Sequence, residues 1–266
     1  MNHKNRFMEM AVPQVRVAGL DGPVSRLGLG TVKFGRTQSL RYSGALRLPT
    51  DTELQNLLSI SRNAGINLLD TAPSYGVSEE RLGLQLKNDR HYWKIIGKAG
   101  EIYSSGRTSF DLRPQSIFLS LEQSLARLRT DFLDVFLIHY TTAVSDVLSD
   151  DLIDALRHVQ DRGMAILVGA STHSTIGGEA AIRNADTILH SASKYAKVDD
   201  RVLLASQKFG KPVFVKKGLN SGYVANPEAS IRSILAHGGV TSLLVGTTNP
   251  RHLRANINAA LPAAMA

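Results

Sequence analysis

The chain has 266 residues, 43% of them hydrophobic and 20% charged, with a formal net charge of +8. This composition is typical of a globular protein long enough for one large domain or two small ones, and the absence of cysteine excludes disulfides, thiolate metal ligands and cysteine nucleophiles. The basic residues are scattered and form no zinc-finger, RNP or basic-helix pattern, so we expect no nucleic-acid partner and a local positive field suited to a small phosphate-bearing ligand.

The N-terminal part of the chain predicts a hairpin. Residues 1–14 have basic side chains but no continuous apolar core, and no apolar run of the chain approaches the ~20 residues that span a bilayer. We therefore expect a cytoplasmic protein with no membrane partner. The dipeptide Asp21-Gly22 then separates two short stretches and predicts a small β-hairpin ahead of the first long strand.

Eight short apolar runs follow the hairpin, and each predicts a strand. They are residues 26–30, 66–70, 94–98, 132–140, 165–171, 186–190, 212–218 and 240–246. Amphipathic segments with the 3.6-residue period of a helix lie between and after them.

Capping residues mark the ends of several of these helices. Thr50 and Glu53 predict a capping box, and Ser78 predicts another N-cap. The pairs Asn226-Pro227 and Asn249-Pro250 each offer a cap followed by a proline at the first helical position. The helix expected between residues 172 and 183 is the least clear.

Continuous apolar strands that alternate with helices indicate a parallel sheet covered on its outer face. Eight such units match a (β/α)8 TIM barrel better than an open doubly wound sheet. We expect the hairpin to cover the bottom of the barrel. No linker or change of composition divides the chain, so we expect residues 1–266 to form one domain.

Polar residues at the carboxyl ends of the strands are the candidates for the active site of such a barrel. They are Asp70, Lys98 and His139, together with Tyr75 in the loop after Asp70. An isolated aspartate there is often only a helix cap, and a lone histidine only a packed core residue. Lys98 differs, because a buried ammonium needs a carboxylate, and Asp70 on the adjacent strand is the natural partner.

This pairing predicts a role for the tyrosine. An ammonium near a phenol stabilises the phenolate, so we expect Lys98 to lower the pKa of Tyr75 and make it a general acid. Asp70 would hold Lys98 charged and oriented. A neutral His139 can donate a hydrogen bond to the same substrate oxygen.

A second candidate site lies near the C-terminus. Arg251, His252 and Arg254 crowd the first turn of a predicted helix, where the macrodipole disfavours cations. The cluster is either a solvated basic turn or an anion site, and phosphate sites after the last two strands of such barrels favour the second interpretation.

Several stretches of the chain resemble the aldo-keto reductases. The resemblance runs through nearly the whole chain, in SRLGLGTVKFG, NLLDTAPSYGVSEERLG, IIGKAG, SLEQSLARLRTDFLDVFLIHY, VGAS, VKKGLNSG and VTSLLVGTTNPRHLRANI. It implies an (α/β)8 barrel that binds NADP(H) without a Rossmann fold and transfers hydride to an aldehyde or ketone. The family's Asp, Tyr, Lys and His tetrad falls on Asp70, Tyr75, Lys98 and His139, with Tyr75 as the proton donor.

The resemblance also implies cofactor contacts. Near the nicotinamide and its ribose they would be Gly30, Thr31 and Ser171, with Thr172 and His190 in place of the usual Asn and Gln. Leu219 and Ser221 match the loop along the pyrophosphate. The turn that grips the adenosine 2′-phosphate would use Thr247, Thr248, Arg251, His252 and Asn256. This turn favours NADPH over NADH. Because the basic residue common before it is Gly246 here, NADH is not excluded.

The leading functional hypothesis is therefore an NADPH-dependent carbonyl reductase, or an enzyme that catalyses the reverse oxidation. A second is an NADP(H)-binding regulatory or partner subunit with little turnover. A third is a Schiff-base aldolase that uses Lys98, which Asp70 disfavours by holding the amine protonated.

No metal is expected, because the remaining histidines show no metal-ligand spacing with carboxylates. The sequence leaves open which small carbonyl or alcohol is the substrate, and whether the protein is a monomer or a homo-oligomer. The tail NAALPAAMA is short for the family, so we expect an open pocket or a partner chain that completes it.

Overall fold

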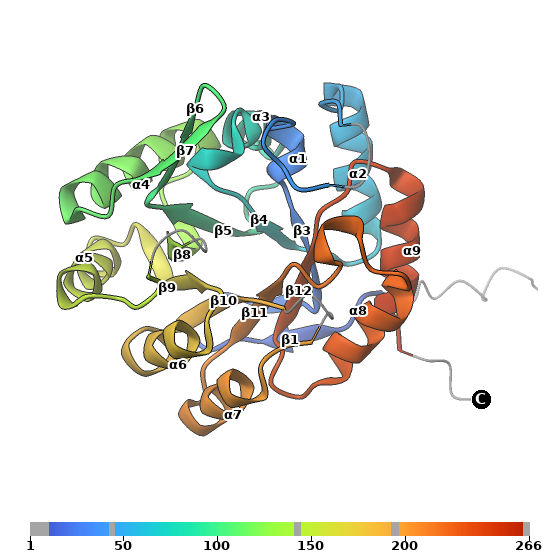
Figure 1. Cartoon of the computed structure of the whole chain (residues 1–266). Helices are drawn as coiled ribbons and strands as arrows, with labels where there is room; N and C mark the ends of the chain where they lie inside the picture. Colours follow the sequence, from blue (N-terminus) through green and yellow to red (C-terminus); the bar gives the residue numbers. More distant parts are fainter. Residues whose placement is uncertain (1–10, 43–45, 141–144, 193–196, 263–266) are drawn as a thin grey trace, which may run out of the picture.

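A closed barrel of eight parallel strands forms the centre of the computed structural model, which describes residues 11–42, 46–140, 145–192 and 197–262. The helices surround the barrel on the outside (Figure 1). Going round the ring, the strands follow the order β10-β11-β12-β3-β4-β5-β8-β9. In chain order they are β3 (Leu27–Gly30), β4 (Leu68–Asp70), β5 (Lys94–Ala99), β8 (Leu133–His139), β9 (Ala165–Thr172), β10 (Thr187–Ser191), β11 (Val213–Lys216) and β12 (Ser242–Val245). The predicted TIM barrel is confirmed.

The helices alternate with these strands, as predicted. They are α1 (Val32–Gly35), α2 (Asp51–Asn63), α3 (Ser78–Gln85), α4 (Pro114–Leu128), α5 (Asp150–Asp161), α6 (Thr175–Asn184), α7 (Asp200–Phe209), α8 (Pro227–Ala236) and α9 (Pro250–Ala260). Two 3₁₀ turns, η2 (Pro73–Tyr75) and η3 (Asn220–Gly222), lie in loops at the carboxyl ends of β4 and β11. None of the helices in the described ranges is long and apolar enough to cross a membrane.

The hairpin at the N-terminus closes one end of the barrel. Strands β1 (Gln14–Arg16) and β2 (Pro23–Ser25) pair antiparallel. Val17 and Val24 belong to the same buried cluster as barrel-interior residues such as Leu68 and Phe214. The expectation that the hairpin covers the bottom of the barrel is therefore confirmed.

A larger buried cluster fills the layer between the strands and the outer helices. Leu54 and Leu57 of α2 and Leu121 of α4 lie in it and are fully or almost fully buried. The barrel wall is therefore apolar on both sides, which leaves the polar residues at the strand ends as the chemically distinct part of the fold.

Most of the predicted caps are present, and one is wrong. The Thr50 hydroxyl and the Glu53 carboxylate form the reciprocal contacts of a capping box, and Asn226 and Asn249 cap α8 and α9. Ser78 is not a cap: α3 is preceded by Val77, and the buried Ser78 hydroxyl donates to the carbonyl and hydroxyl oxygens of Thr31. Ser78 therefore links the start of α3 to the residue after β3 and does not cap its own helix.

A second hairpin was not predicted. Strands β6 (Glu101–Ser104) and β7 (Arg107–Phe110) pair antiparallel directly after β5 (Figure 1). Its first strand begins at Glu101, so the hairpin brings a carboxylate to the same end of the barrel as Lys98.

Candidate active site

Three predicted site residues meet at the carboxyl ends of β4 and β5. The Lys98 ammonium donates to Asp70 Oδ1 at 2.5 Å and to the Thr71 carbonyl at 2.8 Å. It also lies 3.2 Å from the Tyr75 hydroxyl oxygen. The tyrosine hydroxyl and Asp70 Oδ2 are 3.5 Å apart. Lys98 therefore bridges the acid and the phenol, as expected from the sequence.

Two glycines allow the loop that carries Tyr75 to pack directly on α1. A Cβ built on Gly35 would lie 2.4 Å from the Tyr75 carbonyl oxygen, and one on Gly76 would lie 2.2 Å from the Gly35 carbonyl oxygen. Gly76 also has φ of 63°, a conformation that side-chain-bearing residues rarely adopt. This close backbone packing fixes the position of the phenol relative to Lys98.

His139 lies beside the same group at the end of β8. Its ring centroid is 6.2 Å from that of Tyr75, and the rings are close to perpendicular. Its Nδ1 lies 2.8 Å from Glu101 Oε2, although not in the alignment of a regular hydrogen bond. Glu101 also accepts a hydrogen bond from the Ser74 hydroxyl at 2.8 Å. Sequence reasoning missed Glu101, which the unpredicted hairpin supplies.

Burial and contacts with neighbouring groups shift the pKa values of His139 and Glu101. Burial lowers the pKa of His139 to about 4, with Lys98 acting in the same direction and Glu101 opposing, so the imidazole is neutral at pH 7 as expected. Burial would raise the pKa of Glu101, but contacts with His139 and Ser74 lower it below its usual range.

The expected lowering of the tyrosine pKa is wrong for this structure. The pKa of Tyr75 is raised well above its ordinary value by burial of the phenol and by the charges of Asp70 and Glu101. Lys98 does not reverse this, because its charge is matched by Asp70 at 2.5 Å. The phenol is therefore fully protonated near neutrality and available as a proton donor.

The residues expected near a nicotinamide surround the other side of the barrel mouth. Ser171 and Thr172 end β9, and Thr172 Oγ1 lies 2.9 Å from His190 Nδ1 on β10. All three are almost fully buried. Gly30 ends β3, and a Cβ there would lie 4.0 Å from Asp70 Oδ2, in the mouth. The Thr31 hydroxyl donates to the Asp70 carbonyl at 2.9 Å and is used within the protein.

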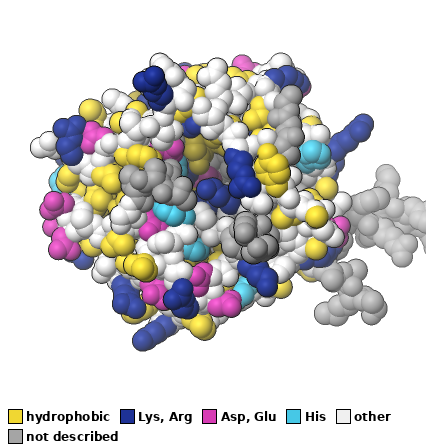
Figure 2. Space-filling view, viewed as in Figure 1, with side chains coloured by type: hydrophobic (Ala, Val, Ile, Leu, Met, Phe, Trp, Pro, Cys, Tyr) yellow, Lys and Arg dark blue, Asp and Glu magenta, His cyan; other side chains and the backbone are white. Residues whose placement is uncertain are grey.

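A further basic residue, Lys216, enters this region from β11. Its Nζ donates to Ser171 Oγ at 2.5 Å. Burial, with Lys217 and Lys98 nearby, lowers its pKa to about 7. Sequence reasoning missed it, although Lys216 ends the apolar run VFVK as Lys98 ends KIIGK, and the same argument applies to both. Figure 2 shows Lys and Arg side chains gathered at a hollow in the middle of one face.

The turn that the sequence predicts to bind a phosphate lies at the start of α9. Arg251, His252 and Arg254 are exposed, and no described carboxylate forms an ion pair with either arginine. The Thr247 hydroxyl accepts a hydrogen bond from the backbone N–H of Asn249. Thr248 is partly buried, and Asn256 is buried on the inner side of the helix. Leu219 and Ser221 lie at η3, which comes after β11 and before α9 in the chain.

These features fit a nicotinamide dinucleotide that carries a phosphate group. The donor groups Ser171, Thr172 and His190 suit a carboxamide, the glycine at position 30 leaves the mouth open, and the unpaired arginines of α9 suit a phosphate. No group of three or more metal-ligating side chains occurs in the described part of the chain.

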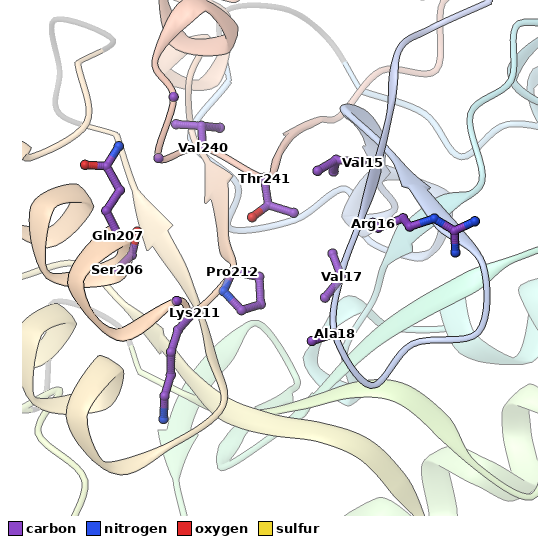
Figure 3. Close-up of a pocket in the computed structure, with 13 residues that line it drawn as sticks. Val15, Arg16, Val17, Ala18, Ser206, Gln207, Lys211, Pro212, Val240 and Thr241 are labelled. Carbon is purple, nitrogen blue, oxygen red and sulfur yellow. The ribbon is translucent and has the colours of Figure 1, made fainter.

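A separate pocket of about 230 Å³ lies at the opposite end of the barrel (Figure 3). It is lined by the N-terminal hairpin and by residues before β11 and β12, including Val15, Val17, Pro212 and Thr241. It holds no acid or histidine, and the Lys211 amine donates to the Ala185 carbonyl. We therefore place the chemistry at the carboxyl ends of the strands.

Comparisons with known proteins show which family this chain is similar to. The model of the aldo/keto reductase family matches residues 26–197. YqkF of Bacillus subtilis, an uncharacterized oxidoreductase, is 30% identical over 159 residues, which are 57% of this chain and 46% of YqkF. The chain thus spans less than half of that relative's length. D-threo-aldose 1-dehydrogenase of a Pseudomonas species is 26% identical over 250 residues, 83% of this chain and 73% of the enzyme. The structure of PA4992 from Pseudomonas aeruginosa superposes with a TM-score of 0.82 at 32% identity, covering 96% of this chain and 97% of that protein.

Proposed function

The chain belongs to the aldo/keto reductase family of oxidoreductases, and on that premise we propose that it interconverts a carbonyl compound and its alcohol with NADP(H) as the hydride carrier. The observation that carries the proposal is the group of Asp70, Lys98 and Tyr75, joined by contacts of 2.5 Å and 3.2 Å at one end of the barrel. We also propose that residues 1–266 act as one domain. The cytoplasmic location stays a prediction.

Tyr75 is the proton donor in this proposal. NADP(H), when bound, would supply the hydride, and the carbonyl oxygen of the substrate would then carry a negative charge. The Tyr75 hydroxyl, held 3.2 Å from the Lys98 ammonium, gives its proton to that oxygen. An alkoxide is a stronger base than a phenolate, so the oxygen that forms is a suitable acceptor for this proton. In the oxidative direction the Tyr75 phenolate would accept the proton of the alcohol.

Lys98, Asp70 and His139 act through this donor. Lys98 stabilises the phenolate that forms, and Asp70 orients Lys98 through the 2.5 Å contact. His139, whose ring centroid lies 6.2 Å from that of Tyr75, would orient the substrate beside this donor. Glu101 is a positioning residue for His139.

The cofactor would be held along the opposite half of the mouth. Ser171, Thr172 and His190 would hold the carboxamide, with Gly30 and Thr31 near the ribose. Leu219 and Ser221 would follow the pyrophosphate. The 2′-phosphate would lie at the start of α9 among Thr247, Thr248, Arg251, His252 and Asn256. The exposed, unpaired arginines there favour NADPH over NADH.

One alternative keeps the cofactor and loses the turnover: an NADP(H)-binding regulatory subunit. The complete proton-donor group argues for an enzyme. Lys98 has three oxygen partners, so it is not presented as the nucleophile of a Schiff-base aldolase. The expectation of an open pocket rests on a tail whose last residues, 263–266, lie outside the described residues.

The test is NADPH consumption, followed by absorbance, against aldehydes, ketones, aldoses and quinones, with a parallel series in which NADP⁺ oxidises aldoses and polyols. We expect turnover of at least one carbonyl class, and weaker use of NADH. Tight NADPH binding by calorimetry with no turnover in either direction would favour the regulatory subunit instead.

A further inference from the structure

Lys216 is a cation in the barrel mouth that the proposed proton transfer does not use. It ends β11, and its Nζ reaches across β10 to Ser171 Oγ on β9 at 2.5 Å. No carboxylate of the described residues lies within ion-pair distance of this amine. Burying a charged amine without a carboxylate partner costs solvation free energy. A buried lysine at this position is therefore a candidate for contact with a ligand.

The ring of strands places Lys216 opposite the proton donor. In the order β10-β11-β12-β3-β4-β5-β8-β9, strand β11 is four positions from β5 in both directions. Lys216 therefore faces Lys98 and Tyr75 across the mouth. In the proposed site Ser171, Thr172 and His190 would hold the carboxamide, so the nicotinamide would lie on the side of the mouth built by β9, β10 and β11.

We propose that Lys216 sets which redox state of the cofactor the protein binds, by placing a positive charge beside the nicotinamide. The oxidised ring is a cation and is repelled by this charge, whereas the reduced ring is neutral. The phosphates are the same in both forms, so they do not contribute to the difference. This inference rests on the proposed function and adds that the site is built to bind NADPH in preference to NADP⁺.

The charge on Lys216 changes near neutral pH, because burial lowers its pKa to about 7. Repulsion of the oxidised ring is therefore strongest below pH 7. Titratable groups from β4, β5, β6, β8 and β10 and from the loops after β9 and β11 act on Lys216 or feel its charge. They are Asp70, Lys98, Glu101, His139, His190, His173 and Lys217. The pKa values of His139 and His190 are about 4, so these two stay neutral between pH 6 and 8.5.

Calorimetric titration of the full chain with NADP⁺ and with NADPH tests the proposal without turnover. We expect the ratio of the two dissociation constants, NADP⁺ over NADPH, to fall as pH rises from about 6 to about 8.5. In Lys216→Met the ratio at pH 6 should fall by about tenfold, which corresponds to about 1.4 kcal/mol, and should lose its pH dependence. Lys216→Arg, which keeps a charge at all these pH values, should keep a high ratio at pH 8.5.

Lys208→Met is the matched control, since Lys208 is an exposed lysine on α7 that is not among the groups acting on Lys216. It should leave the ratio unchanged. An equal loss of affinity for both forms in Lys216→Met would mean that Lys216 contacts a phosphate, and would overturn the proposal. Failure of both forms to bind the wild-type chain would instead overturn the proposed function. Thermal melting of each variant confirms that it is folded.

Discussion

The carboxylate of Glu101 lies 2.8 Å from the imidazole Nδ1 of His139, across the gap between the start of β6 and the end of β8. A second contact, from the Ser74 hydroxyl at 2.8 Å, fixes the carboxylate. Ser74 immediately precedes Tyr75 in the chain, so the proton donor and the histidine are linked through one acid.

Replacing Glu101 tests this link. In Glu101→Gln we expect kcat/KM for the carbonyl substrate to fall by about 10- to 100-fold, because the imidazole loses the group that orients it. The affinity for NADPH should stay unchanged, and the pKa of His139 should fall further, since Glu101 raises it. Steady-state kinetics and NMR titration of His139 measure the two effects. Glu80→Gln, on the exposed side of α3, is the control; an equal loss there would show that the effect is not local.

Breaking the buried ion pair of Lys98 and Asp70 should lower the free energy of unfolding much more than breaking a surface pair. The two side chains are 0% and 7% exposed, whereas in the pair of Arg81 and Asp51 the aspartate is 74% exposed. Asp70→Asn leaves a buried ammonium without a counter-ion, so we expect a loss of about 3–5 kcal/mol in the free energy of unfolding. Asp51→Asn should cost no more than about 1 kcal/mol. Urea denaturation measures both, and similar losses would refute the assigned burial.

Arg251 should lower the stability of the fold and raise the affinity for NADPH. It is a cation in the first turn of α9, where the macrodipole disfavours it. We expect Arg251→Ala to raise the free energy of unfolding by about 0.3–1 kcal/mol while weakening NADPH binding by about tenfold. NADH binding should change little. Arg157→Ala, an exposed arginine on α5, should alter neither affinity. If Arg251→Ala weakened NADPH and NADH equally, the 2′-phosphate would not lie at this turn.

Stability should fall on acidification because buried histidines are neutral in the fold. Burial lowers the pKa of His190 to about 4, below the 6.5 of an unfolded chain. Its contribution is therefore complete above pH 6.5 and is lost as the pH falls towards 4, with a slope of up to about 1.4 kcal/mol per pH unit. His190→Gln should flatten this dependence in urea denaturation series, whereas His158→Gln, a histidine on α5, should leave it as it is. An unchanged slope in His190→Gln would contradict the assigned pKa.

The strands and the proton-donor group could be predicted because local patterns define them. Each barrel strand is a short apolar run, and Lys98 and His139 each follow such a run. The cap at Ser78 was wrong because a tertiary contact with Thr31 competes with the helix end for the hydroxyl. Capping rules describe only the local competition.

Effects from distant parts of the chain could not be predicted. The β6–β7 hairpin was missed, and with it Glu101, whose charge raises the pKa of Tyr75. The inference of a lowered tyrosine pKa considered only Lys98. Lys216 reaches Ser171 across an intervening strand, a contact set by the tilt and closure of the barrel.

The central claim, that Tyr75 delivers the proton, is tested most directly by comparing single turnovers of bound NADPH in the wild type and in Tyr75→Phe. The account predicts that hydride transfer slows by about 10²- to 10⁴-fold in the variant, while the dissociation constant for NADPH is unchanged. An unchanged rate of NADPH oxidation in Tyr75→Phe would contradict it.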